Sequence, residues 1–289
     1  MAPILAARDL EFSYPNGTKA LKAVSLEIER GSKVAVLGPN GAGKSTLFLH
    51  FNGIYRPQRG KVLWEGKELR YDRTSLAGLR QKVGIVFQDP DTQLFSASVM
   101  QEISFGPLNL GLPPEEVRRR VEQAMAAADI TDLAEKPTHF LSYGQKKRVC
   151  IAAVLAMEPE VIIFDEPTAY LDPLLAYQII ELLDEINRKG KTVVLSTHDV
   201  DLAYTWADRV FILKSGLLLA QGRPEEVFLD ESIIREAGLT VPWIVEVYRE
   251  LQKRGWPLDP RPPRNKEALW GCLPWASSAS GPVLKVVRG

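Results

Sequence analysis

The sequence predicts an α/β fold with a mostly parallel core sheet, an antiparallel β hairpin at its start and a helical insert near its middle. Two patterns predict this fold. Short apolar strands alternate with helices over most of the 289 residues, which is typical of sheets whose strands run parallel. A glycine-rich loop also stands directly between an apolar strand and a helix.

The first part of the chain predicts a hairpin and then a buried strand. The segments 4–14 and 20–29 have the length and composition of strands and flank Pro-Asn-Gly at 15–17, and Asn-Gly is a strong signal for a hairpin turn. The apolar segment 33–37 predicts a short strand that leads into the glycine loop and a helix over about 44–52.

The pattern changes between about residues 92 and 143, where we expect a mostly helical insert. Val117, Val121 and Met125 are spaced four residues apart, as on one face of a helix over 115–128. Prolines and glutamates stand at the start of this segment, where a helix tolerates them.

Strands and helices otherwise alternate through the remainder of the chain. Further strands are predicted at 61–64, 83–87, 161–164, 192–196, 210–214 and 217–221, and further helices at 144–157, 173–189 and 199–207. We interpret residues 1–224 as one domain and 225–289 as a C-terminal extension, helical to about 255. From Trp256 on, frequent prolines prevent long helices. This tail is either an irregular arm packed by its tryptophans or a partly disordered segment.

Composition narrows the class of protein. Thirty-six basic residues balance thirty-six acidic ones, so the net charge does not favour binding to nucleic acid. No apolar run approaches the roughly 20 residues that span a bilayer, and the first residues lack the layout of a signal peptide. Cys150 and Cys272 have no disulfide or metal-ligand spacing, and Cys150 is expected to be buried. These features predict a cytosolic globular protein.

The glycine loop has the composition and the flanks of a phosphate-binding P-loop. Residues 38–45 fit G-x4-G-K-S between a strand and a helix, which is the context that separates a P-loop from a chance match. Backbone N–H groups of such a loop, and the helix N-terminus, attract an anion. Lys44 would reach the β- and γ-phosphates of ATP, and the Ser45 hydroxyl would bind Mg²⁺. The predicted ATP-binding residues are Gly38, Pro39, Asn40, Gly41, Ala42, Gly43, Lys44, Ser45 and Thr46.

Polar side chains follow three predicted strands at the point where each strand ends. Asp165 and Glu166 follow the strand 161–164, and at a carboxyl end both can face the crevice where such folds bind ligands. Asp165 suits Mg²⁺ binding and Glu166 suits a general base that polarises the attacking water, although a solvated acidic strand end is the alternative. His198 could contact the γ-phosphate, and Gln88 could reach Mg²⁺ and the water. Taken alone, a histidine beside a strand is more often structural.

A further motif, Leu-Ser-Tyr-Gly-Gln at 141–145, precedes an apolar helix. Ser142 can cap this helix, with Gln145 three positions later as in a capping box. Whether the same helix N-terminus also binds a phosphate is left open by the residues themselves.

The motifs together, in this order, resemble the nucleotide-binding subunit of an ABC transporter over about residues 4–224. The resemblance covers the P-loop, Gln88 as the Q-loop, 141–145 as the signature motif, Asp165-Glu166 as the Walker B motif, Leu171-Asp172 as the D-loop and His198 as the switch. It implies a P-loop NTPase with the ABC-cassette fold and a small C-terminal extension.

The resemblance also implies how the site works. Two subunits pair head to tail around two ATP molecules, so the signature of one subunit completes the site of the other. The residues implied to act in trans are Ser142, Gly144 and Gln145, with Asp172 in the D-loop. The residues implied in catalysis are Glu166, His198, Gln88 and Lys44, and those implied to bind Mg²⁺ are Ser45, Gln88 and Asp165. Tyr14 matches the position whose ring stacks on adenine.

One residue departs from the family pattern. Tyr143 stands where the signature motif usually has glycine, and a residue other than glycine resists positive φ. The backbone freedom of the signature motif at this position is therefore in question.

Two segments, 88–95 and 105–112, resemble the ATPase subunits of energy-coupling-factor importers, which take up cobalt, nickel and vitamins. The implied partners are a second ATPase, identical or related, an integral membrane transport subunit and a substrate-specificity subunit, at the cytoplasmic face of the cell membrane. Leu94 and Phe95 would either face the membrane subunit or be buried in the insert. The alternative function is that of a soluble ABC-type ATPase acting on nucleic acid or ribosomes, but the sequence shows no sustained heptads and no net positive charge.

Overall fold

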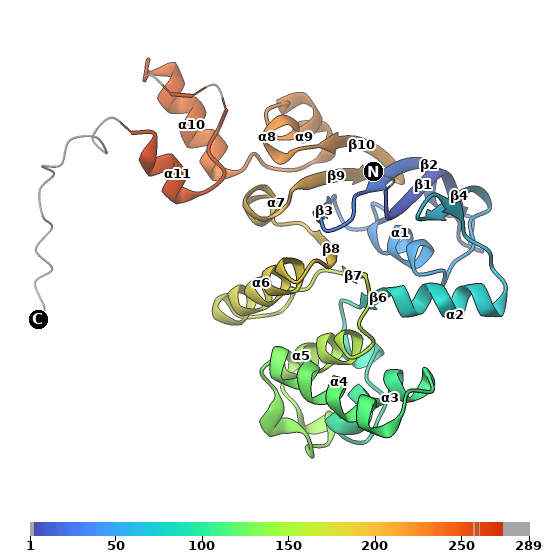
Figure 1. The fold of residues 1–289 in the computed structure, drawn as a ribbon. Coiled ribbons are helices and arrows are strands. Elements are labelled where there is room, and N and C mark those ends of the chain that lie inside the picture. The colour runs from blue at the N-terminus through green and yellow to red at the C-terminus, as the bar shows by residue number, and fades with distance from the viewer. Residues whose placement is uncertain (1–2, 257, 260, 274–289) are drawn as a thin grey trace, which may run out of the picture.

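The computed structural model describes residues 3–256, 258–259 and 261–273, and over these residues the predicted α/β architecture is confirmed (Figure 1). The strands are β1 (Leu5–Ser13), β2 (Lys19–Ile28), β3 (Lys33–Leu37), β4 (Arg59–Trp64), β5 (Lys67–Glu68), β6 (Val83–Val86), β7 (Val161–Phe164), β8 (Thr192–Thr197), β9 (Arg209–Lys214) and β10 (Leu217–Gly222). The α-helices are α1 (Lys44–Phe51), α2 (Arg73–Lys82), α3 (Val99–Asn109), α4 (Pro114–Ala127), α5 (Tyr143–Leu155), α6 (Pro173–Arg188), α7 (Val200–Trp206), α8 (Pro224–Val227), α9 (Glu231–Ala237), α10 (Trp243–Lys253) and α11 (Lys266–Gly271). Short 3₁₀ helices are η1 (Pro90–Thr92), η2 (Thr131–Leu133) and η3 (Thr138–Phe140).

The larger sheet is mostly parallel and has the strand order β10-β9-β3-β8-β7-β6. β3 pairs in parallel with β8 and β9, and β7 with β6 and β8, whereas β10 is antiparallel to β9. Leu37 is paired with Thr197 and Phe164 with Leu195, so the carboxyl ends of β3, β7 and β8 meet at one edge. Every residue of β7 and β8 is buried, as expected of central parallel strands.

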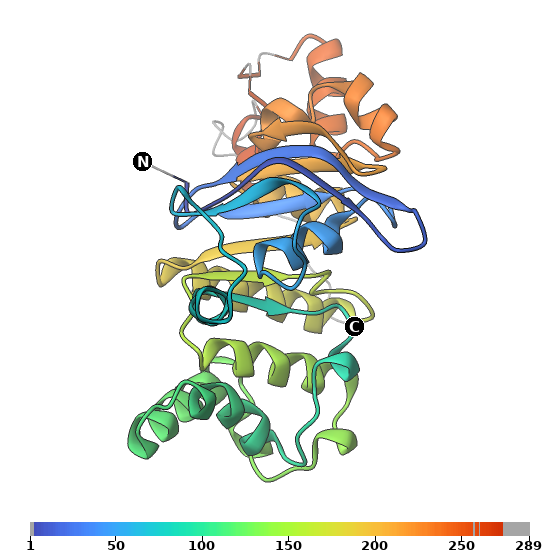
Figure 2. The same cartoon turned by 90° about the vertical axis from the view of Figure 1, so that its right-hand side faces the viewer.

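The smaller sheet is antiparallel, with the order β2-β1-β4-β5, and begins with the predicted hairpin. Its turn is closed by hydrogen bonds from Tyr14 N to Thr18 O (3.0 Å) and from Gly17 N to Tyr14 O (2.9 Å). Gly17 has φ +83°, which explains the glycine in the Asn-Gly pair. Phe48 and Phe51 of α1 are fully buried in one cluster with residues of both sheets, and Figure 2 shows α1 beneath the blue strands.

The helical insert lies at one end of the molecule, where α3 and α4 pack beside α5 (Figure 2). Val117, Val121 and Met125 are all buried, so the predicted helical face is confirmed. They belong to an apolar cluster of their own, to which α5 contributes Val149 and Ala152. Because other residues of α5 belong to the core of the parallel sheet, this helix joins the insert to the core.

The sequence missed helix α2, and it included α9 only within a segment expected to be helical to about residue 255. α2 follows Asp72, whose carboxylate accepts from Ser75 N (3.0 Å), and α9 follows Asp230, which accepts from Ser232 N (3.0 Å). Both aspartates are N-caps, so a capping signal was present in the sequence. α2 was missed because Leu79 is its single buried side chain, and it therefore carries little apolar periodicity.

Burial bears out the interpretation of Cys150, which is fully buried and whose pKa is raised to about 12 by desolvation. Cys272 is partly exposed. Across the described residues, none of the helices combines the length and the apolar character needed to cross a membrane.

The residues after 224 pack on the preceding chain, although the domain boundary placed there stays a prediction. Phe228, Ile244 and Leu269 share one apolar cluster with Tyr204 of α7. The described part of the tail forms a packed arm that includes the short helix α11, which the sequence did not predict. Leu269 is its buried residue, whereas Trp270 is 49% exposed, so this tryptophan does not anchor the arm. The tail beyond residue 273 lies outside the described residues.

Arg264 ties this arm to α7 and α8. Its Nε donates to Tyr204 O (2.7 Å), one terminal nitrogen donates to Ala207 O (2.5 Å), and the other pairs with Glu225 Oε2 (2.9 Å). The guanidinium thus satisfies backbone carbonyls at the end of α7 that would otherwise need other donors.

We expect Arg264→Ala to release the arm and to lower the free energy of unfolding by about 1–3 kcal/mol, because it leaves these carbonyls without their donor. Urea denaturation measures the loss, and limited proteolysis locates the exposed segment. Arg261→Ala is the matched control, since the Arg261 side chain is exposed. Equal effects of the two substitutions would contradict the anchoring role.

Candidate nucleotide-binding and hydrolysis site

The P-loop connects β3 to α1 and needs glycine at two points of close backbone approach. Gly38 has φ +147°, and a Cβ there would lie 2.1 Å from Leu213 O. Gly43 has φ +106°, and a Cβ there would lie 2.5 Å from Ala20 O. Gly43 also brings no side chain to cap the N-terminus of α1, so the first N–H groups of the helix point toward the loop. The loop can therefore wrap a phosphate as its sequence predicts.

Lys44 is buried, with 6% of its surface exposed, and lies over the loop. Its Nζ donates to Gly38 O (2.7 Å) and Pro39 O (3.3 Å) and is 3.6 Å from Glu166 Oε1. A buried ammonium group needs such partners because desolvation is otherwise costly. Its position between the loop and the Glu166 carboxylate is where a phosphate chain would meet an attacking group.

Asp165 and Glu166 follow β7 and are both buried. Glu166 has φ +44°, in the left-handed region that residues other than glycine rarely adopt. This turn ends the alternation of the strand at Glu166. The Ser196 hydroxyl braces the turn, because it accepts from Glu166 N (2.9 Å) and donates to Asp165 Oδ1 (2.5 Å).

The sequence did not single out Ser196. The signal that could have found it is its place near the end of β8, two residues before His198. The parallel pairing of β7 with β8 brings this strand end beside the two carboxylates.

His198 lies against Glu166, as its strand-end position predicts. Its Nδ1 is 3.3 Å from Glu166 Oε2, while 72% of the side-chain surface remains exposed. The imidazole can therefore orient the carboxylate and still meet a ligand from the solvent side.

A cavity of about 400 Å³ brings most of the predicted site together. It is lined by Tyr14, Thr18, Lys19, Ala20, Asn40, Gly41, Ala42, Gly43, Lys44, Ser45, Thr46, Gln88 and Glu166. Its volume lies within the usual range of small-molecule sites. The Tyr14 hydroxyl is hydrogen-bonded to Thr46 Oγ1 (2.8 Å), and the Tyr14 ring meets Phe12 edge to face. Asp165 is not among the residues that line the cavity.

The signature motif lies outside this cavity. Ser142 Oγ accepts from Gln145 N (3.3 Å) while Gln145 Oε1 accepts from Ser142 N (3.0 Å), so the predicted capping box is present. Ser142 is exposed, whereas Gly144 is buried, and a Cβ there would lie 2.1 Å from Leu175 Cδ2. Asp172 caps α6 by accepting from Leu175 N (2.9 Å).

The backbone conformation of Tyr143 shows whether a residue other than glycine fits the signature motif. It is the first residue of α5 and is not among the residues with positive φ. A tyrosine therefore fits this backbone without strain, and the restriction expected from the loss of glycine does not arise.

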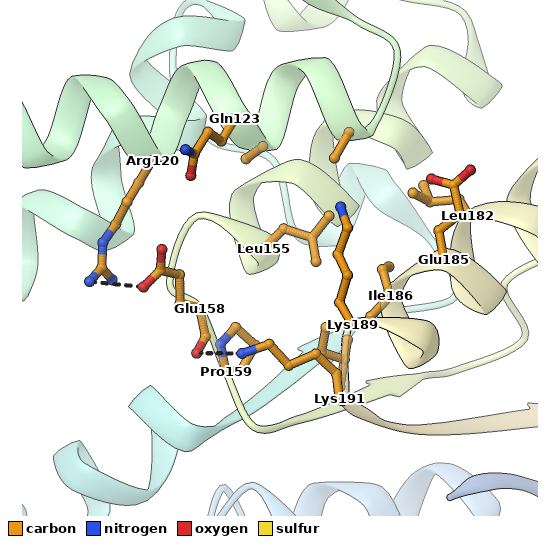
Figure 3. A pocket seen from close by; sticks show the side chains of 13 residues that line it. Arg120, Gln123, Leu155, Glu158, Pro159, Leu182, Glu185, Ile186, Lys189 and Lys191 are labelled. Atoms are coloured by element: carbon orange, nitrogen blue, oxygen red, sulfur yellow. Dashed lines mark hydrogen bonds and ion pairs between the residues drawn. The ribbon is translucent and has the colours of Figure 1, made fainter. Parts of the chain in front are cut away.

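A second cavity lies at the opposite edge of the parallel sheet, between α4, α5, α6 and the start of β7 (Figure 3). It holds about 140 Å³ and has an apolar wall that includes Leu155 and Ile162. Arg120 pairs with the Glu158 carboxylate (3.0 Å), and Lys191 Nζ donates to Glu158 O (3.4 Å). Because these groups contact one another instead of forming a phosphate cradle, we assign nucleotide binding to the P-loop cavity.

Comparison with known proteins defines the class. A family model described as ABC transporter matches residues 21–169, and the chain belongs to the ABC transporter family of ATP-binding proteins. It is thus an ATPase whose hydrolysis is coupled to transport.

Close relatives narrow the class to energy-coupling-factor transporter ATPases. The chain is 51% identical over 251 residues to the energy-coupling factor transporter ATP-binding protein EcfA of Methanocaldococcus jannaschii, covering 87% of this chain and 90% of that protein. The corresponding protein of Methanococcus maripaludis is 49% identical over 250 residues, covering 86% and 90%.

Solved structures of similar proteins support the same class. The cbiO1 protein of Clostridium perfringens, part of the ABC transporter complex cbiONQ, has a TM-score of 0.74 and 48% identity, covering 86% of this chain and 100% of that one. A dimeric ATP-binding cassette bound to ADP and Pi in a post-hydrolysis state has a TM-score of 0.70 and 30% identity, covering 76% and 98%.

Tyr14 can be tested separately from the phosphate loop. We expect Tyr14→Ala to raise the Kd for ATP about five- to a hundredfold, as the loss of one aromatic platform under a base does, while the Kd for inorganic tripolyphosphate stays within about twofold. Tyr14→Phe, which keeps the ring and loses the bond to Thr46, is the matched control. Equal weakening of both ligands by Tyr14→Ala would assign Tyr14 to the phosphate loop instead of adenine.

Proposed function

We propose that this chain powers an energy-coupling-factor importer that takes up a metal ion, cobalt first, or a vitamin through an integral membrane partner. The observation that carries the ATPase part is the buried Glu166 carboxylate, which stands at the end of β7 in contact with both Lys44 and His198. The type of importer is supported by the relatives named as energy-coupling factor transporter ATP-binding proteins. The cargo is proposed from segments 88–95 and 105–112, which resemble importers of cobalt, nickel and vitamins.

Hydrolysis requires a base, a charge clamp and an oriented water. Glu166 accepts a proton from the water as its oxygen bonds to the γ-phosphorus and the bond to the β-phosphate oxygen breaks, releasing ADP and phosphate. Lys44 neutralises charge on the phosphates, and His198 holds Glu166 toward the water. Gln88, which lines the same cavity, is the second group proposed to orient the water.

Residues that fit a Mg²⁺ ion surround the P-loop. Ser45 and Gln88 line the cavity, and Asp165 is a buried carboxylate held by Ser196 (2.5 Å), so the donors are the oxygen atoms that Mg²⁺ prefers. Bound Mg²⁺ supplies neutralisation of charge on the β- and γ-phosphates. Ser45, Gln88 and Asp165 are the residues that we propose to hold it.

A second ATPase subunit, identical or related, completes the site in this proposal. Ser142 is exposed and lies outside the cavity of its own chain, as a group that serves another subunit must. Ser142, Gly144 and Gln145 then act in trans at the γ-phosphate, with Asp172 at the D-loop of the interface. The dimeric relative bound to ADP and Pi supports the arrangement.

The membrane partner is proposed to dock beside the Q-loop at the cytoplasmic face of the membrane. Phe95 is 65% exposed and Phe105 is 48% exposed, and the centroids of their rings are 4.7 Å apart. Leu108, which follows Phe105 on α3, is 58% exposed. Leu94, by contrast, packs against the apolar clusters. Of the two residues that the sequence left open, Phe95 is therefore the one available to a partner. A substrate-specificity subunit would select the cargo.

Co-purification tests the class of partner. We expect the chain, tagged and expressed in its own cells, to carry an integral membrane protein from a detergent extract, and Phe95→Ser with Phe105→Ser to reduce that yield several-fold. Cells that contain the complex should accumulate labelled cobalt or a labelled vitamin. Recovery of nucleic acid or ribosomes instead would favour the alternative of an ATPase that acts on those partners.

Glu166→Gln tests the base. We expect it to leave the Kd for ATP nearly unchanged, to lower kcat at least a hundredfold because an amide cannot accept the proton, and to trap an ATP-bound dimer. Glu185→Gln makes the same chemical change at an exposed site on α6 and should leave kcat unaltered. Near-normal hydrolysis by Glu166→Gln would contradict the assignment.

A further inference from the structure

Two side chains of α5 bind the backbone of the Q-loop. The Tyr143 hydroxyl donates to Gln88 O (3.0 Å), and Lys147 Nζ donates to the same oxygen (2.5 Å) and to Phe87 O (3.0 Å). The two residues are four apart on one helix and therefore point from the same face. Together with the carbonyl of Gln88 we call them the Q-loop clamp.

Lys147, the second donor of the clamp, is fully buried. A buried amine must be hydrogen-bonded, and desolvation lowers the pKa of Lys147 to about 8. The two donors occupy both acceptor directions of the Gln88 carbonyl. The backbone just before Gln88 has a further contact, since Gln93 Oε1 accepts from Phe87 N (2.9 Å).

The two ends of the clamp serve different parts of the reaction. Gln88 lines the cavity of its own chain, whereas Ser142, the N-cap of α5, is exposed and outside that cavity. α5 also carries the insert, because its residues belong to both the insert cluster and the core cluster. The last residue of α5, Leu155, borders the second cavity (Figure 3). The first turns of α5, which carry the clamp, are therefore the part of the helix that lies next to the nucleotide site.

We propose that Tyr143 is a positioning residue that couples the two ATP sites of the dimer through Gln88. This rests on the proposed head-to-tail dimer. When Ser142 engages the nucleotide of the partner subunit, α5 is fixed, and the clamp then fixes the Gln88 backbone at the chain's own site. Glycine at position 143 would lack the hydroxyl, so the departure from the usual signature motif gains a physical role.

Tyr143→Phe tests this role, because it keeps the ring and removes the hydroxyl alone. We expect the Kd for ATP of the dilute subunit to stay within about twofold, kcat to fall about three- to tenfold, as for the loss of one hydrogen bond, and the Hill coefficient for ATP to fall toward one. A merely structural role would weaken ATP binding together with kcat. The matched control is Tyr248→Phe, which also removes a hydroxyl that donates to a backbone carbonyl, that of Asp259, far from the site.

The outcomes separate this proposal from the dimer on which it rests. If wild-type activity per subunit does not rise with protein concentration, the shared site is wrong. If it rises, and Tyr143→Phe keeps the wild-type kcat and Hill coefficient, the clamp is wrong and the dimer stands. Loss of ATP binding by Tyr143→Phe in parallel with kcat would equally overturn the positioning role.

Discussion

Parallel pairing of β3, β7 and β8 is the constraint on which the site depends. It places the P-loop, the Asp165-Glu166 pair and His198 at the same edge of one sheet. A slip of one residue in the strand pairing moves a strand end by roughly 3.3 Å. This shift equals the 3.3 Å distance between His198 Nδ1 and Glu166 Oε2, so it would break that contact. The catalytic contacts therefore require the register observed. Ser196 of β8 is hydrogen-bonded to both residues that follow β7, so a slip of either strand would break these contacts as well.

At this edge of the sheet, a locally strained backbone positions the charged side chain of Glu166. The left-handed backbone of Glu166 costs of the order of 1–3 kcal/mol and persists because its surroundings over-determine it. Ser196 bonds both Glu166 N and the Asp165 carboxylate, so one hydroxyl offsets part of that cost. Lys44 then compensates the buried Glu166 carboxylate across 3.6 Å. Buried charges that support one another in this way are typical of sites that act on phosphates.

α5 connects this edge to the rest of the molecule. Its first residues carry the signature motif, its buried face joins the insert to the core, and Tyr143 and Lys147 hold the Q-loop. The C-terminal extension is attached at a different place, through Arg264 and Leu269 on the far side of α7. Thus α5 reaches the nucleotide site, whereas the helices of the C-terminal extension do not.

The sequence by itself determined the P-loop, most of the order of strands and helices, and the family, because these depend on local spacing: glycines where the backbone approaches Leu213 and Ala20, apolar alternation, and motifs in a fixed order. It also placed Glu166 and His198 correctly at strand ends. Ser196 and the Q-loop clamp were decided by the tertiary structure alone, since each joins residues about 30 or more positions apart through strand register or helix packing. Tyr143 illustrates the difference. From the sequence, this residue raised only a question about backbone φ. Its proposed role comes from its hydroxyl, because the packing of α5 on the end of β6 brings that group to Gln88.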